Sequence, residues 1–156
     1  MKINLKSLLF NTLVPIMISF IIAMLIPSYQ SYYESLNVPL RLPPIAFIIA
    51  WLIIYILIGL GAYLIENNQK LSEKETSKVL RLYYLNLLIN FSYTIVAFWI
   101  RSITLATVIT FVLLHLTILV TYKFYKINKV SGLLFIPYIL WMILANYIQL
   151  GIYFLN

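Results

Sequence analysis

Five apolar runs, each about as long as a bilayer is thick, constrain this chain more than any other feature of its sequence. One helical crossing of a membrane needs about 20 apolar residues. The runs cover residues 8–26, 45–65, 79–100, 103–122 and 132–155. They lack the apolar–polar alternation of barrel strands, although many of their residues are β-branched. The sequence therefore predicts an all-α fold, an integral membrane bundle of five transmembrane helices.

The composition supports this class and limits the chemistry available to the chain. Of 156 residues, 63% are hydrophobic and 10% are charged, and the mean hydropathy is +0.99. The five runs leave room only for connections, so we expect residues 1–156 to form a single membrane domain. Cysteine and aspartate are absent and glutamate occurs four times. The sequence therefore indicates neither thiol chemistry nor a metal site built from intramembrane carboxylates.

Basic residues fall unequally on the two sides of the predicted bundle. Nine of the eleven would share one side: Lys2, Lys6, Lys70, Lys74, Lys78, Arg81, Lys123, Lys126 and Lys129. Only Arg41 and Arg101 would lie on the other. The positive-inside rule then places the N-terminus in the cytoplasm and the C-terminus outside, and we expect the membrane to be that of a bacterial cell. Cations in such short loops favour contact with membrane lipids, and we expect no nucleic acid as a partner.

The connection 27–44 is far longer than two helices require, and it contains four prolines and three tyrosines. Prolines reduce the entropy lost when a loop is held in one shape, so this outer loop is typical of a lid over a site. An aromatic belt at the membrane interface is an equally good interpretation, because it accounts for Tyr29, Tyr32 and Tyr33 without a ligand.

Aromatic, small and amide side chains recur at helical spacing in three of the runs. Those that share a face are Trp51, Tyr55, Gly59 and Ala62 in the second run, Asn86, Asn90 and Tyr93 in the third, and Tyr138, Trp141, Ala145 and Gln149 in the fifth. An unpaired amide is costly in hydrocarbon, so the amides, Asn146 included, should point into the bundle. For each amide alone, a hydrogen bond between helices is the better interpretation. Together with the aromatic residues, they would suit a mostly apolar pocket with a few polar groups.

Two further aromatic residues are better explained without a site. His115 lies well inside the fourth run, and a single histidine is more typical of a packed or hydrogen-bonded side chain than of a haem ligand. Trp99, close to Arg101 at the end of a run, is typical of an interface anchor. The glycines form no GxxxG motif, so that motif predicts no helix-mediated dimer.

Four motifs in order along the chain resemble the TspO/MBR family, the tryptophan-rich sensory proteins related to the mitochondrial translocator protein. The loop pattern of an aromatic pair, Leu and Pro-x-x-x-Pro-Pro is matched by residues 32–44, and Trp-x-x-x-Tyr-x-x-x-Gly by residues 51–59. Leu82-Tyr83 with Asn90 follows, and Pro-Tyr-x-x-Trp-x-x-x-Ala is matched by residues 137–145. The chain departs from the family pattern at Tyr32, at Arg41, where a tryptophan is common, and at Gln149, where an asparagine is usual.

The resemblance implies a five-helix bundle, often a homodimer, that binds porphyrins such as protoporphyrin IX and haem as ligands and requires no cofactor. Together with the aromatic and amide faces described above, it predicts the binding residues: Tyr33, Arg41, Trp51, Tyr55, Asn86, Asn90, Tyr138, Trp141, Ala145 and Gln149. A macrocycle would stack on Trp51 and Trp141, and Arg41 would pair with a propionate.

The function implied is a membrane sensor or binding protein whose intrabundle pocket is closed by the outer loop. A transporter of tetrapyrroles or lipids is the second hypothesis. The third is weak light-dependent degradation of porphyrin, for which some bacterial relatives use the tryptophans that correspond to Trp51 and Trp141. A purely structural membrane protein is the fourth.

Overall fold

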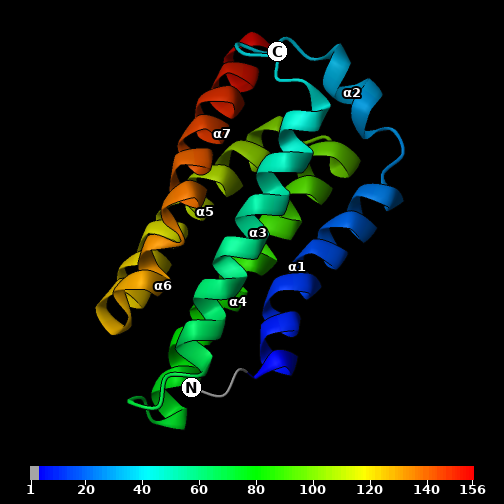
Figure 1. The fold of residues 1–156 in the computed structure, drawn as a ribbon. Helices are drawn as coiled ribbons and strands as arrows, with labels where there is room; N and C mark the ends of the chain where they lie inside the picture. The colour runs from blue at the N-terminus through cyan, green and yellow to red at the C-terminus, as the bar shows by residue number, and fades with distance from the viewer. Residues whose placement is uncertain (1–3) are drawn as a thin grey trace.

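The computed structural model describes residues 4–156, so that Lys2 lies outside the described residues. Five segments are long and apolar enough to cross a membrane: Leu5–Leu25, Pro44–Glu66, Glu73–Ile100, Ile103–Ile127 and Lys129–Leu155. Within residues 4–156 no strand is present. The expected all-α membrane bundle is therefore confirmed (Figure 1).

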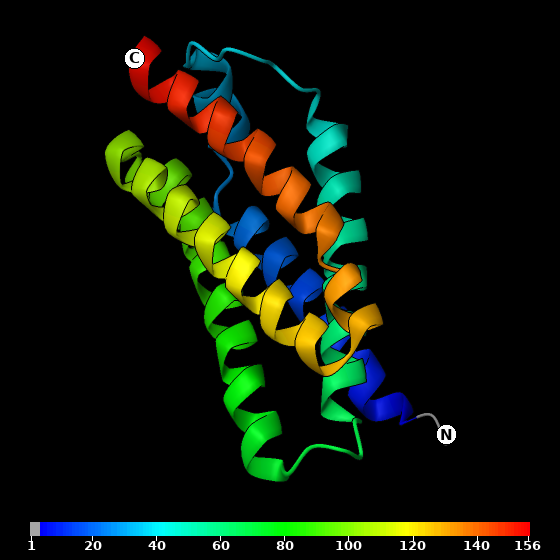
Figure 2. The same ribbon diagram turned by 90° about the vertical axis from the view of Figure 1, so that its left-hand side faces the viewer.

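The long helices are α1 (Leu5–Leu25), α3 (Pro44–Glu66), α4 (Glu73–Thr94), α5 (Ile103–Ile127) and α7 (Ile136–Leu155). Three shorter elements accompany them: α2 (Tyr29–Ser35), the π-helical η1 (Ile95–Ile100) that continues α4, and α6 (Lys129–Leu133). α1 packs on α3, and α5 packs on both α4 and α7. The link from α3 to α4 lies at the end of the bundle nearer the N-terminus, and α2 and the C-terminus lie at the other (Figure 2).

Capping residues explain where the helices begin, and they correct some of the expected bounds. The third helix begins at Glu73 and not near residue 79, because the Ser72 hydroxyl accepts from the Glu75 N–H and the Glu75 carboxylate accepts from the Ser72 N–H. The fourth extends to Ile127 instead of ending near residue 122, and Asn128 then caps α6 through the Ser131 N–H. Proline at the start of α3 fixes the entry to that helix.

The outer loop 27–44 is not irregular throughout, because α2 forms inside it. Tyr29 and Tyr32 of α2 place their rings 4.9 and 6.4 Å from the ring of Phe98 in η1. The second half of the loop is fixed to the end of α7. There the Asn37 N–H donates to Asn156 Oδ1 (3.0 Å), and Asn156 Nδ2 donates to the Asn37 carbonyl (2.9 Å). The loop thus contacts η1 at one end and α7 at the other.

Candidate ligand site between α3 and α7

Aromatic side chains from the outer loop, α3 and α7 pack against one another, from the loop to the middle of α3. We refer to Tyr33, Phe47, Trp51, Tyr55, Tyr138 and Trp141 as the aromatic cluster. Its ring centroids are 6.3 Å apart for Trp51 and Trp141, 5.9 Å for Trp51 and Tyr138, and 5.3 Å for Trp51 and Tyr55. Phe47 lies 5.7 Å from Trp141 and 5.9 Å from Tyr33, and so joins the helices to the loop.

The tryptophan pair thus brings together two residues that are 90 positions apart in the sequence. Both indoles are half-buried, whereas Tyr55 and Tyr138 beneath them are buried. Phe47 was missed by the sequence analysis, although it lies one helical turn before Trp51.

On its buried side, the aromatic cluster is hydrogen-bonded to the side-chain amide of Asn90. Asn90 of α4 accepts from the Tyr55 hydroxyl at its Oδ1 (2.7 Å) and donates from its Nδ2 to the Tyr138 hydroxyl (3.2 Å). One side chain therefore links α3, α4 and α7. Asn90 is only 5% exposed, so its amide is surrounded by protein and is shielded from lipid.

The remaining amides predicted for the site are also buried, as the cost of exposing them to hydrocarbon requires. Asn86 donates to the Thr117 hydroxyl (2.9 Å), and Gln149 accepts from the Tyr93 hydroxyl (2.8 Å). Each bond connects two different helices, so these two residues take the interhelical role within the bundle. Ala145 is half-buried on α7, one turn after Trp141, where it packs against the core.

Arg41 lies across the outer loop itself. Its guanidinium donates to the carbonyls of Leu36 (2.7 Å) and Tyr33 (3.3 Å), and it lies 5.4 Å from the centre of the Tyr33 ring. Arg41 therefore holds the loop together in this structure. The Tyr33 hydroxyl is buried and has no hydrogen-bond partner among residues 4–156. Burial raises the pKa of Tyr33, while the charge of Arg41 acts in the opposite direction.

Arg41→Gln should loosen the outer loop, because it removes both charge-assisted hydrogen bonds to the loop carbonyls. We expect amide hydrogen exchange over residues 29–42 to rise about fivefold, as for the loss of about 1 kcal/mol at an exposed site. Exchange measured by mass spectrometry checks this, with Lys74→Gln as a control of equal charge at the other end of the bundle. Unchanged protection over residues 29–42 would show that the bonds to Asn156 suffice to hold the loop.

An apolar groove of about 330 Å³ runs along the seam between α3 and α7. It is lined by Ala50, Ile53, Ile54, Pro137, Leu140, Trp141 and Leu144. Trp141 belongs both to the groove and to the aromatic cluster. The pocket predicted within the bundle stays a prediction, and the groove lies beside Trp141, whose ring packs against Trp51 and Phe47. Nothing in the sequence distinguished its aliphatic lining from ordinary lipid-facing residues.

His115 and Trp99 lie away from this site. His115 is exposed on α5, with Nδ1 2.8 Å from the Phe111 carbonyl one turn earlier, so the histidine is hydrogen-bonded as expected. Trp99 is 64% exposed at the end of η1, which agrees with the expected interface position.

Comparison with known proteins assigns the chain to a family. The model of the TspO/MBR family matches residues 11–155. The chain belongs to the TspO/MBR family. It is 30% identical over 138 residues to tryptophan-rich protein TspO of Bacillus cereus, covering 88% of each chain. It is 28% identical over 130 residues to tryptophan-rich protein TspO of Archaeoglobus fulgidus, covering 83% of this chain and 82% of the relative.

A third relative is protein CrtK of Rhodobacter capsulatus, which is 28% identical over 130 residues and covers 81% of this chain and 79% of its own. Membership of the TspO/MBR family and five helices able to span a bilayer make this an integral membrane protein. The family match covers every residue of the aromatic cluster.

Proposed function

We propose that this TspO/MBR protein binds a porphyrin, such as protoporphyrin IX or haem, between α3 and α7 and acts as a membrane sensor or binding protein. The observation that carries the proposal is the tryptophan pair, whose indoles lie 6.3 Å apart on facing helices beside an apolar groove of about 330 Å³. A flat apolar ring gains both buried area and favourable ring geometry from such neighbours.

Binding would follow the existing contacts. A macrocycle that enters along the groove would meet Trp141 first. If it then inserts between the two indoles, the contact between Trp51 and Trp141 is replaced by one contact of each indole with the ligand. The buried Tyr33 hydroxyl, which has no partner in the described part of the chain, would offer a donor at the rim nearest the loop. Arg41 would exchange its bonds to the loop carbonyls for a propionate, so that ligand binding and loop structure would be coupled.

The test is a titration of protoporphyrin IX into the protein in nanodiscs, followed by the porphyrin Soret band so that the signal does not depend on the number of tryptophans. The titration is done in darkness, which prevents photo-oxidation of the porphyrin. We expect saturable binding, and Trp51→Phe or Trp141→Phe should each weaken it about tenfold, the effect of losing roughly 1 to 1.5 kcal/mol of ring contact.

Trp99→Phe is the matched control, because Trp99 is outside the aromatic cluster. It should leave the affinity unchanged. Two outcomes would contradict the proposal. One is the absence of saturable binding, and the other is an uptake that none of the three substitutions changes, as partition of the porphyrin into the lipid would give.

We also propose the orientation of the bundle. The α3–α4 and α5–α6 connections lie at the end of the bundle nearer the N-terminus (Figure 1), and basic residues lie in them or in the adjoining helix ends: Lys70, Lys74, Lys78, Arg81, Lys123, Lys126 and Lys129. Arg41 belongs to the outer loop, and Arg101 donates to Ser28 just before α2. The positive-inside rule supports a cytoplasmic N-terminus and an external outer loop in a bacterial cell membrane. A ligand would then reach the aromatic cluster from the outer leaflet.

A further inference from the structure

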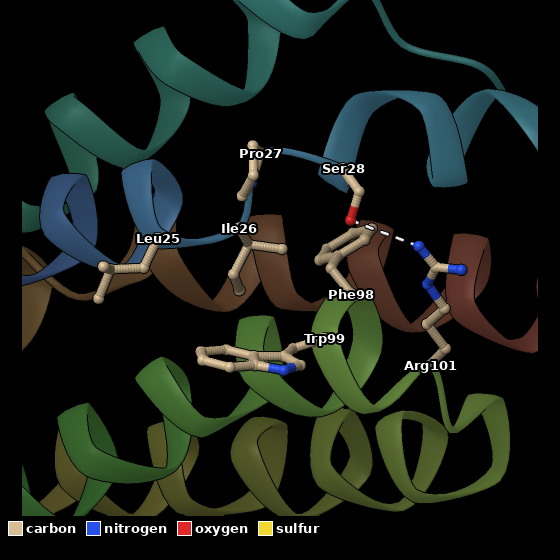
Figure 3. Close-up of a pocket in the computed structure, with 7 residues that line it drawn as sticks. All are labelled: Leu25, Ile26, Pro27, Ser28, Phe98, Trp99 and Arg101. Atoms are coloured by element: carbon tan, nitrogen blue, oxygen red, sulfur yellow. Dashed lines mark hydrogen bonds between the residues drawn. The ribbon is translucent and has the colours of Figure 1, made fainter.

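A second pocket, of about 220 Å³, lies where α1 meets η1, apart from the groove between α3 and α7. It is lined by Leu25, Ile26, Pro27, Ser28, Phe98, Trp99 and Arg101 (Figure 3). None of these residues belongs to the aromatic cluster. The pocket combines one cation and one hydroxyl with an otherwise apolar wall.

The backbone at Arg101 adopts a conformation that is unusual for its residue type. Arg101 has φ 57° and ψ 36°, and it is the one residue other than glycine with positive φ within residues 4–156. This left-handed conformation is unfavourable for an L-residue, because its Cβ comes close to the following carbonyl oxygen. It follows the π-helical turn of η1, where the Arg101 N–H and the Ser102 N–H both donate to the Val96 carbonyl. Strained residues of this kind and π-helical turns both concentrate at functional sites.

The strained turn directs the Arg101 side chain towards the link between α1 and α2. Its Nη2 donates to Ser28 Oγ at 3.4 Å, and its guanidinium carbon lies 4.8 Å from the centre of the Tyr32 ring. Figure 3 shows the guanidinium turned to Ser28, with the Phe98 ring beside both. This long bond is the single hydrogen bond of the Arg101 side chain within residues 4–156.

The two cations at this end of the bundle therefore differ. Arg41 donates to two loop carbonyls, whereas within residues 4–156 the exposed side chain of Arg101 uses one of its five N–H groups in a hydrogen bond. Glu34, the acidic residue of this end, accepts instead from Gln30 Nε2 at 3.1 Å. The charge of Arg101 is thus available to an external anion.

The walls of the pocket indicate which anion would fit. Leu25 and Trp99 are 63% and 64% exposed at the ends of segments able to cross a membrane, where they would contact acyl chains. Trp is also enriched at headgroup depth. A guanidinium recognises phosphate through paired N–H donors, and the Ser28 hydroxyl adds a further donor beside it. A soluble phosphate would use the polar groups but would gain nothing from the apolar walls.

We propose that this pocket is a binding site for the phosphate headgroup of a membrane lipid, held by Arg101 and Ser28, with the acyl chains lying along Leu25 and Trp99. The site is independent of the porphyrin site. It would connect the lipid to the outer loop, because Ser28 precedes α2 and Arg101 also contacts Tyr32.

Native mass spectrometry of the intact protein, released from micelles that contain palmitoyl-oleoyl-phosphatidylglycerol, tests the proposal by counting retained lipid. Palmitoyl-oleoyl-glycerol, which has the same acyl chains and no phosphate, is the matched probe. We expect retention of the phospholipid and not of the diacylglycerol. Arg101→Gln should lower the affinity for the phospholipid about fivefold, whereas Arg41→Gln, with the same loss of charge at the same end, should not.

A second measurement locates the lipid. In a Trp51→Phe, Trp141→Phe background, Trp99 is the remaining tryptophan and can be excited selectively at wavelengths that tyrosine does not absorb. Brominated phosphatidylglycerol should quench its fluorescence more strongly in that background than in the same background with Arg101→Gln. Arg101→Lys keeps the charge and should retain most of the binding, and circular dichroism checks that each variant is folded.

Three results would overturn the proposal. The first is an equal loss of phospholipid binding in Arg101→Gln and Arg41→Gln. The second is retention of the diacylglycerol to the same extent as the phospholipid. The third is displacement of the phospholipid by an equal concentration of glycerol 3-phosphate, which would make a soluble phosphate the ligand.

Discussion

Gly59→Val should separate α1 from α3 and lower the free energy of unfolding by about 3 kcal/mol, the upper range for overpacking a well-packed interior. A Cβ atom at Gly59 would lie 2.8 Å from both the Asn11 carbonyl carbon and the Thr12 Cα, and closer still to the Asn11 carbonyl oxygen. These are backbone atoms of α1, so no side-chain rotation relieves the clash. The whole helix has to move.

Movement of α1 would also break the polar contacts at its N-terminal end. The Glu66 carboxylate of α3 accepts from Ser7 Oγ (2.5 Å) and from Asn11 Nδ2 (2.6 Å). Because both bonds require α1 and α3 to stay in register, their loss would add to the effect of the clash.

Thermal unfolding followed by circular dichroism in detergent checks the Gly59 prediction. Gly59→Ala should give a smaller loss than Gly59→Val, in proportion to the added volume. Leu52→Val, on the same helix and 46% exposed, is the control and should be nearly neutral. Equal stability of Gly59→Val and the native protein would show that α1 can shift on α3 at little cost.

Asn90→Leu should destabilise the bundle by about 2 to 3 kcal/mol, because the substitution leaves two buried hydroxyls without a partner. The hydroxyls of Tyr55 and Tyr138 bond to opposite ends of the Asn90 amide, and the three residues belong to three helices. No water from the bilayer can replace these bonds. The same change should disturb the aromatic cluster above it, since Tyr55 and Tyr138 both contact Trp51.

A double-mutant cycle separates the polar contribution from packing. If the bond to Tyr55 carries part of the loss, Tyr55→Phe should cost less in the Asn90→Leu background than in the native protein. Tyr153→Phe, which removes an exposed hydroxyl on α7, is the control. Additive effects of Asn90→Leu and Tyr55→Phe would mean that the 2.7 Å bond contributes nothing measurable.

The helical fold could be predicted because its causes are local. Each long run, such as 45–65, carries enough apolar residues for one crossing, and prolines mark the start of α3 at Pro44. The bounds were less predictable where caps decide them. Ser72 and Glu75 lie in a strongly charged stretch, and their capping box extends α4 by almost two turns beyond the apolar run.

The residues of the candidate site were only partly predictable. Helical spacing placed Trp51 and Tyr55 on one face and Tyr138 and Trp141 on another, and the structure brings these faces together. Spacing placed Phe47 on the face of Trp51, but it did not show that Phe47 would contact Tyr33 of the loop or that Asn86 would bond to Thr117. Both depend on which helices are neighbours.

By itself, the sequence determined the membrane class, the five spans, the unequal distribution of basic residues and the burial of the amides. The reason is that the free energy of transferring a group between water, interface and hydrocarbon depends on that group and its nearest neighbours along the chain. The tertiary structure alone decided which polar groups pair, where the groove opens beside Trp141 and how the two outer arginines differ. Arg41 binds carbonyls of its own loop, while Arg101 meets Ser28 from 73 residues away. Such contacts depend on distances between helices, and no periodicity within one helix encodes them.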